Sequence, residues 1–301
     1  MAQTRIFVVG SSNTDMVIKS DKLPAPGETI LGNQFLMNAG GKGANQAVAA
    51  AKLGADVHFV GKVGDDIFGR QAVEGLKNVG INTRFVYTDP NEPSGVALIL
   101  VDKKGENSIS VASGANSFLN TTEVTEAIAE ANEYDLLLVQ LETSIQTVET
   151  AIQQASLKNM PVILNPAPAQ EIPLSLYPKI TFITPNETET EFFTGVKVID
   201  LTTARKAAQI FHERGTPHVI ITLGAKGAFY HSETEQFTVD SPTVNAVDTT
   251  AAGDVFNGAL TVALSEKKSI REAITFACMA AAISVTRMGA QASAPTRAEV
   301  S

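Results

Sequence analysis

Short apolar runs alternate with longer amphipathic stretches along most of the chain. Runs that are apolar throughout are typical of strands that other elements cover on both faces. They predict strands at residues 6–9, 57–60, 136–140, 162–164, 180–183 and 219–222. Apolar residues at helical spacing predict helices at residues 44–53, 68–79, 122–131, 145–158, 203–214, 252–264 and 270–286. Because strand and helix alternate, the pattern predicts a parallel sheet whose strands are joined by crossover helices.

Two regions depart from this alternation. Residues 15–19 and 29–36 have strand-like patterns on either side of the turn-rich segment 23–27, and no helix is predicted to follow them. Residues 96–101 and 107–111 have the pattern of a hairpin, and the second of these runs alternates as in a half-exposed sheet. These segments predict a small second sheet whose apolar face must be covered, either by a symmetric partner or by a ligand.

Composition and charge narrow the class of protein. The chain has 301 residues, of which 44% are hydrophobic, enough for one large α/β unit or two ordinary domains. Its formal net charge is −9, and its lysines and arginines are scattered along the sequence. A nucleic-acid partner is therefore not expected.

The lack of a targeting segment and the positions of the cysteine and the histidines indicate where the protein works and whether it holds a metal. The apolar stretch near the N-terminus is too short for a signal peptide, and no later segment approaches a membrane span. A cytoplasmic protein with no membrane partner is therefore expected. The single cysteine, Cys278, excludes an internal disulfide and lies in an apolar helical pattern, which by itself indicates a small buried side chain. The four histidines show no metal-ligand spacing, so a transition metal held by the protein is not expected.

The segment Asp248-Thr-Thr-Ala-Ala-Gly-Asp254 leads directly into a predicted helix. Small residues at a helix N-terminus let a ligand approach the free backbone N–H groups, which attract anions such as phosphate. A carboxylate beside such a site suits a base that accepts a proton from the group attacking the phosphate, a role that Asp254 could fill. Aspartate before a helix is also a common cap, so the segment alone leaves both interpretations open.

Polar and glycine-rich segments follow several predicted strands, where open α/β sheets bind their ligands. Asn13 and Asp15 follow the first strand and suit hydroxyl groups, although an ordinary polar turn explains them equally. Residues 39–46 combine glycines with Lys42 and Asn45 before a helix. That combination allows close backbone approach to a ligand, and it also suits a structural turn.

Three further strands end in the same way. Glu142 follows the strand at 136–140. Asn186 and Glu189 begin a helix after the strand at 180–183, where they could hold a hydrated Mg²⁺ or form a capping box. Gly224 and Gly227 close another strand and leave room for a nucleotide phosphate or sugar. Because the carboxyl ends of parallel strands meet at one edge of a sheet, the joint position of these segments favours a single ligand site.

The glycine-rich and acidic segments together resemble the two signatures of the PfkB carbohydrate kinases. Gly40-Gly-Lys-Gly-Ala-Asn45 and residues 248–254 occur in the expected order near opposite ends of the chain, and the resemblance extends from Val9 to Pro295. Within the family it is strongest to kinases that act on D-ribose. Residues 10–15, 165–169, 184–189, 221–224 and 289–293 carry that likeness.

The resemblance implies a fold, a reaction and an assembly. The fold would be a three-layer, doubly wound, mostly parallel α/β sheet in one domain over residues 1–301, with a small β-sheet lid inserted from about residues 15–36 and 96–111. The reaction would be phosphoryl transfer from ATP to the 5-hydroxyl of D-ribose, giving ribose 5-phosphate. Mg²⁺ would accompany the nucleotide, and a monovalent cation, usually K⁺, would activate the enzyme. The assembly would be a homodimer joined through the lid sheet.

The resemblance also carries site residues over, position by position. Asp254 would be the base, beside an anion hole made by the N–H groups of Ala252, Gly253 and Asp254. The sugar would be held by Asn13, Asp15, Gly41, Lys42, Gly43, Asn45, Glu142 and Asp254. The nucleotide would contact Asn186, Thr222, Gly224, Lys226, Gly227, Gly253 and Cys278, with Glu189 organising Mg²⁺. The monovalent cation would lie beside Asp248, Thr250, Ser284, Arg287, Gly289 and Ser293, several of them through backbone carbonyls.

Other functions remain open at this point. A kinase for 2-deoxyribose would need most of the same residues, and fructose, a nucleoside or a sugar phosphate are further candidate acceptors. A sugar phosphate would call for additional basic residues in the lid segments, and none is evident there. A non-catalytic sugar-binding module is the alternative of another class, although such a module has no chemical need for Lys42, Glu189, Gly253 and Asp254.

Overall fold

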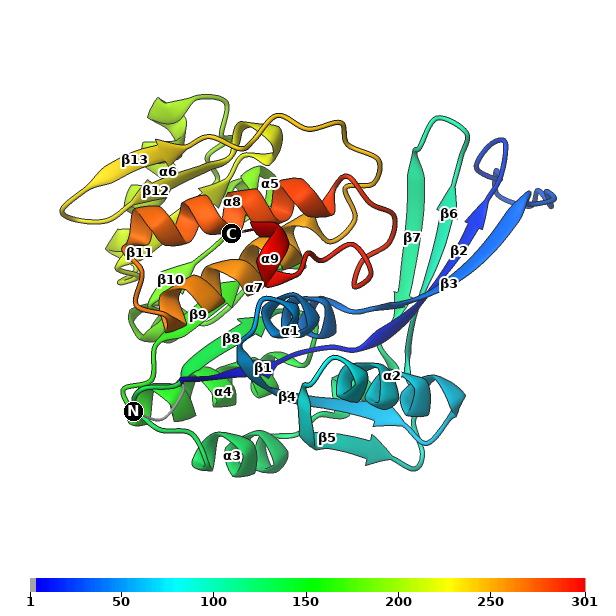
Figure 1. Cartoon of the computed structure of the whole chain (residues 1–301), viewed down its shortest axis with the longest axis horizontal. Helices are drawn as coiled ribbons and strands as arrows, with labels where there is room; N and C mark the ends of the chain where they lie inside the picture. Colours follow the sequence, from blue (N-terminus) through cyan, green and yellow to red (C-terminus); the bar gives the residue numbers. More distant parts are fainter. Residues whose placement is uncertain (1–3, 301) are drawn as a thin grey trace.

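The structure is a computed structural model, and it describes residues 4–300 (Figure 1). Within that range, one sheet runs in the strand order β13-β12-β11-β10-β9-β8-β1-β4-β5. Its strands are β1 (Arg5–Val9), β4 (Asp56–Gly64), β5 (Asn82–Asp89), β8 (Leu136–Gln140), β9 (Val162–Asn165), β10 (Phe182–Ile183), β11 (His218–Thr222), β12 (Ala228–His231) and β13 (Gln236–Val239). Pairing is parallel from β5 to β11, and β12 and β13 add antiparallel strands at one edge. The expected doubly wound, mostly parallel sheet is confirmed.

Helices cover both faces of this main sheet, which makes three layers. Alternation along β1 divides the core, because Phe7 and Val9 join one buried apolar cluster while Ile6 and Val8 join the other. The first cluster includes side chains of α3 (Thr121–Ala129), α4 (Ile145–Leu157), α5 (Glu187–Thr194) and α6 (Leu201–Glu213). The second includes those of α1 (Lys42–Lys52), α2 (Ile67–Asn78), α7 (Ala252–Ser265) and α8 (Ile270–Ser284). Short segments complete the chain: η1 (Gly114–Phe118), η2 (Leu174–Lys179), η3 (Gly224–Lys226) and α9 (Arg297–Val300).

Helices α1 and α7 approach each other closely at small residues, and this contact positions the site described below. A side chain at Gly258 of α7 would bring its Cβ within 2.7 Å of the Gln46 carbonyl oxygen in α1. The facing turn of α1 contains Ala49 and Ala50, which are both buried. Small residues on both helices therefore let the N-terminal turns of α1 and α7 lie side by side.

A second, four-stranded sheet projects beside the main one, at the right of Figure 1. Its order is β3-β2-β6-β7, from β2 (Asn13–Lys19), β3 (Gln34–Gly40), β6 (Gly95–Val101) and β7 (Asn107–Ala112). We call it the lid sheet. Asn13 and Asp15 point to one of its faces, while Met16 and Ile18 point to the other, because side chains alternate along a strand.

The sequence pattern was wrong about one lid strand. The strand expected at 29–36 lies at Gln34–Gly40, and α1 follows it after Gly41, so this strand does lead into a helix. The displaced strand is fixed by its antiparallel register with β2, which pairs Asn13 with Gly40 and Lys19 with Gln34. Strands β5, β12 and β13 and the short α9 were not predicted, and β12 and β13 are only four residues each.

Strand β4 is longer than its apolar run. The run at 57–60 continues as a strand to Gly64 through the buried Lys62. The Lys62 ammonium is balanced by Glu123 at 2.8 Å and Asp89 at 3.7 Å. A buried charge that is paired in this way does not end a strand. Among residues 4–300, no helix combines the length and the apolar character needed to cross a membrane.

Candidate active site

A group of charged side chains lies where the lid sheet meets the N-terminal turns of α1 and α7. Lys42 is at its centre: burial alone would lower the pKa of this lysine, but four neighbouring carboxylates outweigh burial and raise it. In order of influence these belong to Asp254, Glu142, Glu189 and Asp15. The structure therefore brings together residues that the sequence places on five separate segments.

Asp254 is the third residue of α7 and is almost completely buried. The helix begins after Ala251, which has a left-handed backbone with φ of 60° and no side-chain cap. Neither acid of the segment caps this helix, so the capping interpretation is wrong. The Asp248 carboxylate instead accepts hydrogen bonds from the N–H groups of Thr250 and Gly289, both at 2.9 Å.

Two amide side chains of α1 hold the Asp254 carboxylate. Asn45 Nδ2 donates to Oδ2 and Gln46 Nε2 donates to Oδ1, each at 2.9 Å. Burial raises the pKa of Asp254, and the positive charge of Lys42 is the largest influence in the opposite direction. A buried carboxylate with a raised pKa and a fixed orientation has the properties of a general base.

The first turn of α7 offers free donors beside Asp254. In the part of the chain that the structure describes, the N–H groups of Gly253 and Asp254 have no acceptor. The N–H of Ala252 differs, because it donates to the Thr249 carbonyl at 3.3 Å. Two of the three donors expected for an anion hole are thus free, and they lie at the positive end of a helix dipole.

The loop before α1 packs tightly against the segment between β1 and β2. Gly41 has a φ of 89°, and a Cβ there would lie 2.7 Å from the Asn13 nitrogen. A Cβ on Gly43 would lie 2.6 Å from the Ser11 nitrogen. Glu142 joins the two segments, because its carboxylate accepts from the Lys42 N–H at 2.9 Å and from the Ser11 hydroxyl. The glycines are therefore needed for packing and also lie at the predicted sugar site.

Asp15 lies on the lid face that is turned toward these groups. Burial, followed by the negative charges of Glu142 and Asp254, raises its pKa to about 6. Asn13, two residues earlier on the same face, is 5% exposed. The lid sheet thus contributes one carboxylate and one amide to the same space as Lys42.

A cavity of about 550 Å³ opens on the other side of the α7 N-terminus. Seven of the predicted residues line it: Asn186, Thr222, Gly224, Gly227, Ala252, Gly253 and Cys278. Cys278 is buried, and burial raises the pKa of its thiol to about 12, so it is at once a buried small side chain and part of the cavity wall. Lys226 is exposed and does not line the cavity, so the structure gives its side chain no part there.

Glu189 does not line this cavity, but it lies near enough to Lys42 for its negative charge to raise the pKa of that lysine. It forms the capping box of α5: its carboxylate accepts from the Asn186 N–H at 2.9 Å, and the Asn186 side chain accepts from the Glu189 N–H at 2.8 Å. Among residues 4–300, no three side chains of His, Cys, Asp or Glu gather into a metal-ligand group. A single carboxylate suits Mg²⁺ that keeps most of its waters and is carried by nucleotide phosphates.

The residues expected around a monovalent cation lie in the loop before α7, at the end of α8 and in the loop after α8. Asp248 joins the two loops, because its side chain accepts from the Gly289 N–H and its own N–H donates to the Val285 carbonyl. Ser284 and Ser293 are buried, and each hydroxyl donates to a backbone carbonyl, which leaves its oxygen able to accept. The Arg287 side chain pairs with Glu299, so only its backbone remains for a cation.

Sequence reasoning missed a set of buried amides beneath Asp254. Gln140 Nε2 donates to Gln46 Oε1 at 2.6 Å, and Gln46 Nε2 donates to Asn165 Oδ1 at 2.9 Å as well as to Asp254. Gln46 and Gln140 are fully buried. Two features of the sequence could have pointed to these amides. Gln140 is the polar residue that ends an otherwise apolar strand, and Gln46 directly follows Asn45.

Comparison with known proteins agrees with this geometry. The profile of the pfkB family carbohydrate kinase matches residues 3–297. The chain is 49% identical to the ribokinase of Haemophilus influenzae over 98% of this chain and 96% of that protein. It is 39% identical to the deoxyribokinase of Salmonella typhi over 97% of this chain and 95% of that protein. The structure of the Arabidopsis thaliana ribokinase complexed with ribose and ATP has a TM-score of 0.90, with 33% identity and coverage of 100% of this chain and 98% of that one.

Proposed function

The chain belongs to the pfkB family of carbohydrate kinases, and we propose that it transfers the γ-phosphoryl group of ATP to the 5-hydroxyl of D-ribose. The observation that carries the proposal is the position of Asp254: it lies beside Lys42 on one side and beside the free N–H groups of the α7 N-terminus on the other. A base, a cation and an anion-binding helix end meet at one point. That is the arrangement required for an in-line attack by a hydroxyl on a phosphoryl group.

In this mechanism Asp254 accepts the proton of the sugar hydroxyl as the oxygen attacks. A bond forms between that oxygen and the γ-phosphorus, and the bond between the γ-phosphorus and its bridging oxygen breaks to release ADP. The N–H groups of Gly253 and Asp254 stabilise the negative charge on the transferred group, and Lys42 adds a positive charge from the sugar side. Mg²⁺, organised through Glu189, supplies neutralisation of the nucleotide phosphates when bound.

Sugar recognition falls to the groups around Lys42. Asp15 and Glu142 accept hydrogen bonds from sugar hydroxyls, while Asn13, Lys42 and Asn45 donate. Gly41 and Gly43 let this loop pack directly against the segment between β1 and β2. ATP occupies the cavity lined by Asn186, Thr222, Gly224 and Gly227, with its phosphates directed at the α7 N-terminus.

A monovalent cation would act next to this helix end. It would be held by Asp248, Thr250, Ser284, Arg287, Gly289 and Ser293, with Arg287 contributing its backbone. The loop that carries Asp248 leads directly into the N-terminal turn of α7. Ordering of this loop by K⁺ therefore orders the anion hole, and the expected result is a higher kcat in K⁺ than in a bulky organic cation.

One assay tests the proposal and its rivals together. ADP release is measured with ribose, 2-deoxyribose, fructose or adenosine as acceptor, each with and without K⁺. The expected result is the highest kcat/KM with ribose, raised by K⁺. A specific observation supports 2-deoxyribose as the second candidate, since a deoxyribokinase is among the similar proteins. Failure of every acceptor to stimulate ADP release would leave a non-catalytic sugar-binding module.

We further propose that the chain works as a single kinase domain whose lid sheet closes over the sugar. The lid face that carries Asp15 also exposes Ile109 and Val111 toward the site, so closure would bury apolar surface and exclude water. ATP hydrolysis without ribose is then expected to be much slower than phosphoryl transfer with ribose. Equal rates of ADP release in the two conditions would contradict closure by the lid.

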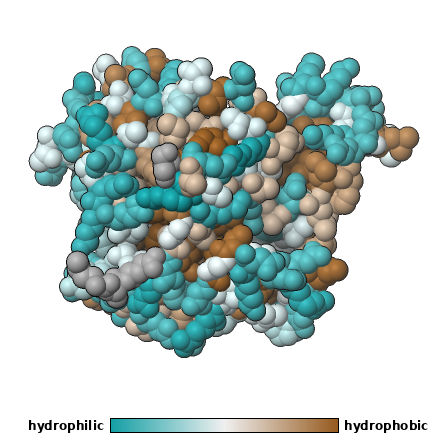
Figure 2. All heavy atoms as spheres, in the orientation of Figure 1, coloured by the Kyte–Doolittle hydropathy of each residue, from teal (hydrophilic) through white to brown (hydrophobic). Residues whose placement is uncertain are grey.

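The opposite face of the lid sheet suits a second copy of the chain. Ile18, Phe35, Met37 and Leu98 are exposed there, and they are neighbours in the strand register around Met16. Figure 2 shows apolar side chains gathered on the lid at the right of the molecule. An exposed apolar patch of this kind favours a homodimer through the lid.

Light scattering on a variant pair tests the dimer. Leu98→Glu puts a charge into the patch and is expected to give a monomer, while Leu31→Glu puts the same charge on an exposed side chain outside the strands and is expected to leave the dimer intact. A monomeric wild-type protein would contradict the dimer. We also infer that the enzyme works in the cytoplasm, where ATP and Mg²⁺ are present, and cell fractionation tests this.

A further inference from the structure

Asn116 is a buried polar residue that the mechanism above does not use. It lies on η1, between the end of lid strand β7 and the start of α3, and is 1% exposed. Its side chain pairs with the backbone of Ser12: the Ser12 N–H donates to Asn116 Oδ1 at 2.9 Å, and Asn116 Nδ2 donates to the Ser12 carbonyl at 3.2 Å. It also donates to the Ser113 carbonyl at 2.9 Å. The Ser12 N–H requires an acceptor, and the Ser12 and Ser113 carbonyls require a donor. These partners therefore determine which end of the Asn116 amide is the oxygen and which is the nitrogen.

That orientation determines the orientation of Asn13. Asn116 Nδ2 lies 2.8 Å from the Asn13 side chain, and a donor at this position requires an acceptor, so the Asn13 oxygen Oδ1 must face it. In the part of the chain that is described, Asn13 Nδ2 has no acceptor. Asn13 is on the same lid face as Asp15. The amide group that remains for a ligand is therefore the NH₂ group.

A glycine on the neighbouring strand makes room for this contact. Gly95 is the cross-strand partner of Asn13 in the parallel pair of β2 and β6. A Cβ at Gly95 would lie 2.2 Å from Asn116 Nδ2 and 2.2 Å from Asn13 Oδ1. Any larger residue at 95 would therefore separate the two amides.

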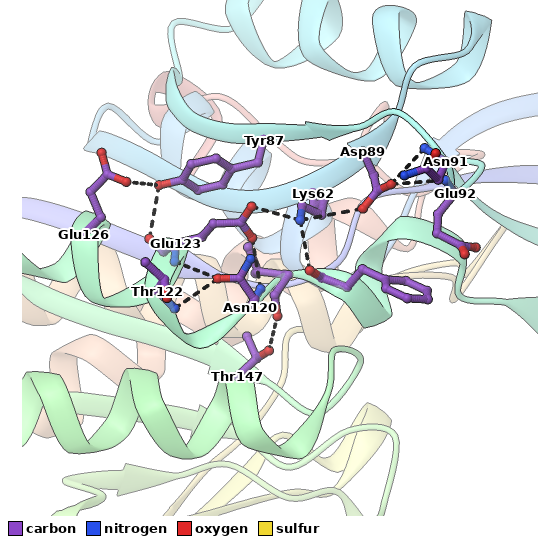
Figure 3. Close-up of polar contacts among 12 residues, drawn as sticks. Lys62, Tyr87, Asp89, Asn91, Glu92, Asn120, Thr122, Glu123, Glu126 and Thr147 are labelled. Atoms are coloured by element: carbon purple, nitrogen blue, oxygen red, sulfur yellow. Dashed lines mark hydrogen bonds and ion pairs between the residues drawn. The ribbon is translucent and has the colours of Figure 1, made fainter.

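The segment η1, which carries Asn116, is also anchored to the main sheet. Lys62 of β4 donates to the carbonyl of Phe118, the last residue of η1, at 3.0 Å. The same ammonium group pairs with Glu123 and Asp89, as Figure 3 shows. Because Lys62 is buried and bonded on three sides, η1 is held in place, and Asn116 can transmit that fixed position to the first residue of the lid.

We propose that Asn116 is a positioning residue for the sugar, which fixes the Asn13 side chain with its NH₂ group directed at a sugar oxygen. The proposal rests on the sugar-binding role of Asn13. Together the two lid residues then present one donor, Asn13, and one acceptor, Asp15. A sugar that binds must then offer one oxygen that accepts from Asn13 and one hydroxyl that donates to Asp15.

Steady-state kinetics on three variants test the proposal. Asn116→Ala frees the Asn13 amide to rotate and is expected to raise the KM for ribose about tenfold, the loss of one oriented hydrogen bond. Asn116→Asp has nearly the same shape and keeps an acceptor for the Ser12 N–H, but it sets an acceptor against Asn13 Oδ1. The Asn13 amide then turns round and presents its oxygen to the sugar, so a rise in the KM of more than tenfold is expected. In both variants kcat and the KM for ATP should stay within about threefold of wild type, because neither changes Asp254 or the nucleotide cavity.

A matched control separates this effect from lost stability. Asn120→Ala removes the capping box of α3, where the Asn120 side chain accepts from Thr122 and Glu123, and it is expected to lower the Tm without changing the KM for ribose. If Asn116→Ala does not fold, the nearly isosteric Asn116→Asp carries the test alone. A KM for ribose that follows the Tm across all these variants would overturn the proposal.

Asn13→Ala and the double variant Asn13→Ala/Asn116→Ala distinguish the positioning role of Asn116 from the sugar-binding role of Asn13. An unchanged KM for ribose in Asn13→Ala would contradict the sugar role of Asn13 itself. A raised KM in Asn13→Ala, with unchanged values in both Asn116 variants, would overturn the role of Asn116 and leave the site intact. The expected result is that Asn13→Ala/Asn116→Ala is no worse than Asn13→Ala, because Asn116 acts through Asn13. Fully additive effects would contradict that.

Discussion

The two halves of the proposed active site contain different kinds of residue. The sugar side is made of long polar side chains, with Lys42 among four carboxylates and with amides that fix the orientation of Asp254. The nucleotide side is a cavity of about 550 Å³ whose wall is largely glycine, alanine, threonine and other small residues. The first half therefore depends on the chemical identity of its side chains, and the second on their small size.

This difference decides what substitutions should do. On the sugar side, an isosteric change that alters only charge or hydrogen bonding should be severe. On the nucleotide side, loss of a functional group should matter little, and added bulk or a forbidden backbone conformation should matter most.

Asp254→Asn keeps the shape of the sugar side and removes the base. We expect kcat to fall by about 10²–10⁴-fold, because an amide cannot accept the proton of the attacking hydroxyl. Ribose affinity measured by calorimetry should change little, since the buried position of residue 254 is preserved. Wild-type turnover in this variant would show that another group is the base.

Asp15→Asn should weaken sugar binding and stabilise the fold. Loss of a charged acceptor is expected to raise the KM for ribose by about 10- to 100-fold. The pKa of Asp15 is raised to about 6 from an ordinary value of 3.8, so the folded protein binds this proton more tightly than the unfolded chain does. Ionised Asp15 therefore destabilises the fold above pH 6, and the asparagine variant removes that effect.

Urea denaturation at two pH values checks the sign. At pH 7.5 the variant should have the higher midpoint. As the pH falls through 6 the wild-type protein takes up the proton and regains stability, so the difference should narrow by pH 5. A difference that stays constant or widens on acidification would contradict the raised pKa.

Two glycines at the nucleotide cavity offer a matched pair. Both Gly224 and Gly227 have positive φ, at 56° and 92°, but a Cβ on Gly227 would lie 2.0 Å from the Val239 carbonyl oxygen while one on Gly224 meets nothing within 4 Å. Gly224→Ala should therefore cost only the backbone strain of about 1 kcal/mol. Gly227→Ala should lose more stability and raise the KM for ATP without changing ribose affinity. Equal free energies of unfolding for the two variants would contradict this account.

Cys278 should give the smallest effect. Burial raises the pKa of its thiol to about 12, so almost no thiolate is present at pH 8 and alkylation of the folded enzyme by iodoacetamide should be slow. Mass spectrometry against the urea-unfolded chain measures the difference. Cys278→Ala should change the KM for ATP by less than about threefold, because only one small apolar contact is altered. Rapid alkylation of the native protein would contradict the buried position.

The sequence predicted the main sheet well because its signal is local. Continuous apolar runs identify strands such as β1, β8 and β11, whichever strands they pair with. In the helices between them, apolar residues recur about every 3.6 positions. The pattern failed where pairing decides the structure. Lid strand β3 lies at Gln34–Gly40 because of its register with β2, and β4 extends past its apolar run because distant carboxylates balance Lys62.

The candidate site likewise has features that the local sequence predicts and features that only the tertiary structure determines. The sequence by itself determined which segments are expected to carry chemistry, since Lys42, Glu142, Glu189 and Asp254 all follow strands or begin helices in recognisable motifs. It left Asp254 open between cap and base, and only the tertiary structure excluded the cap. It gave no sign that Gln46 would hold Asp254 or that Asn116 would orient Asn13. Those contacts join residues more than a hundred positions apart, and the partner of a buried amide is determined by the fold that surrounds it, not by its neighbours in the chain.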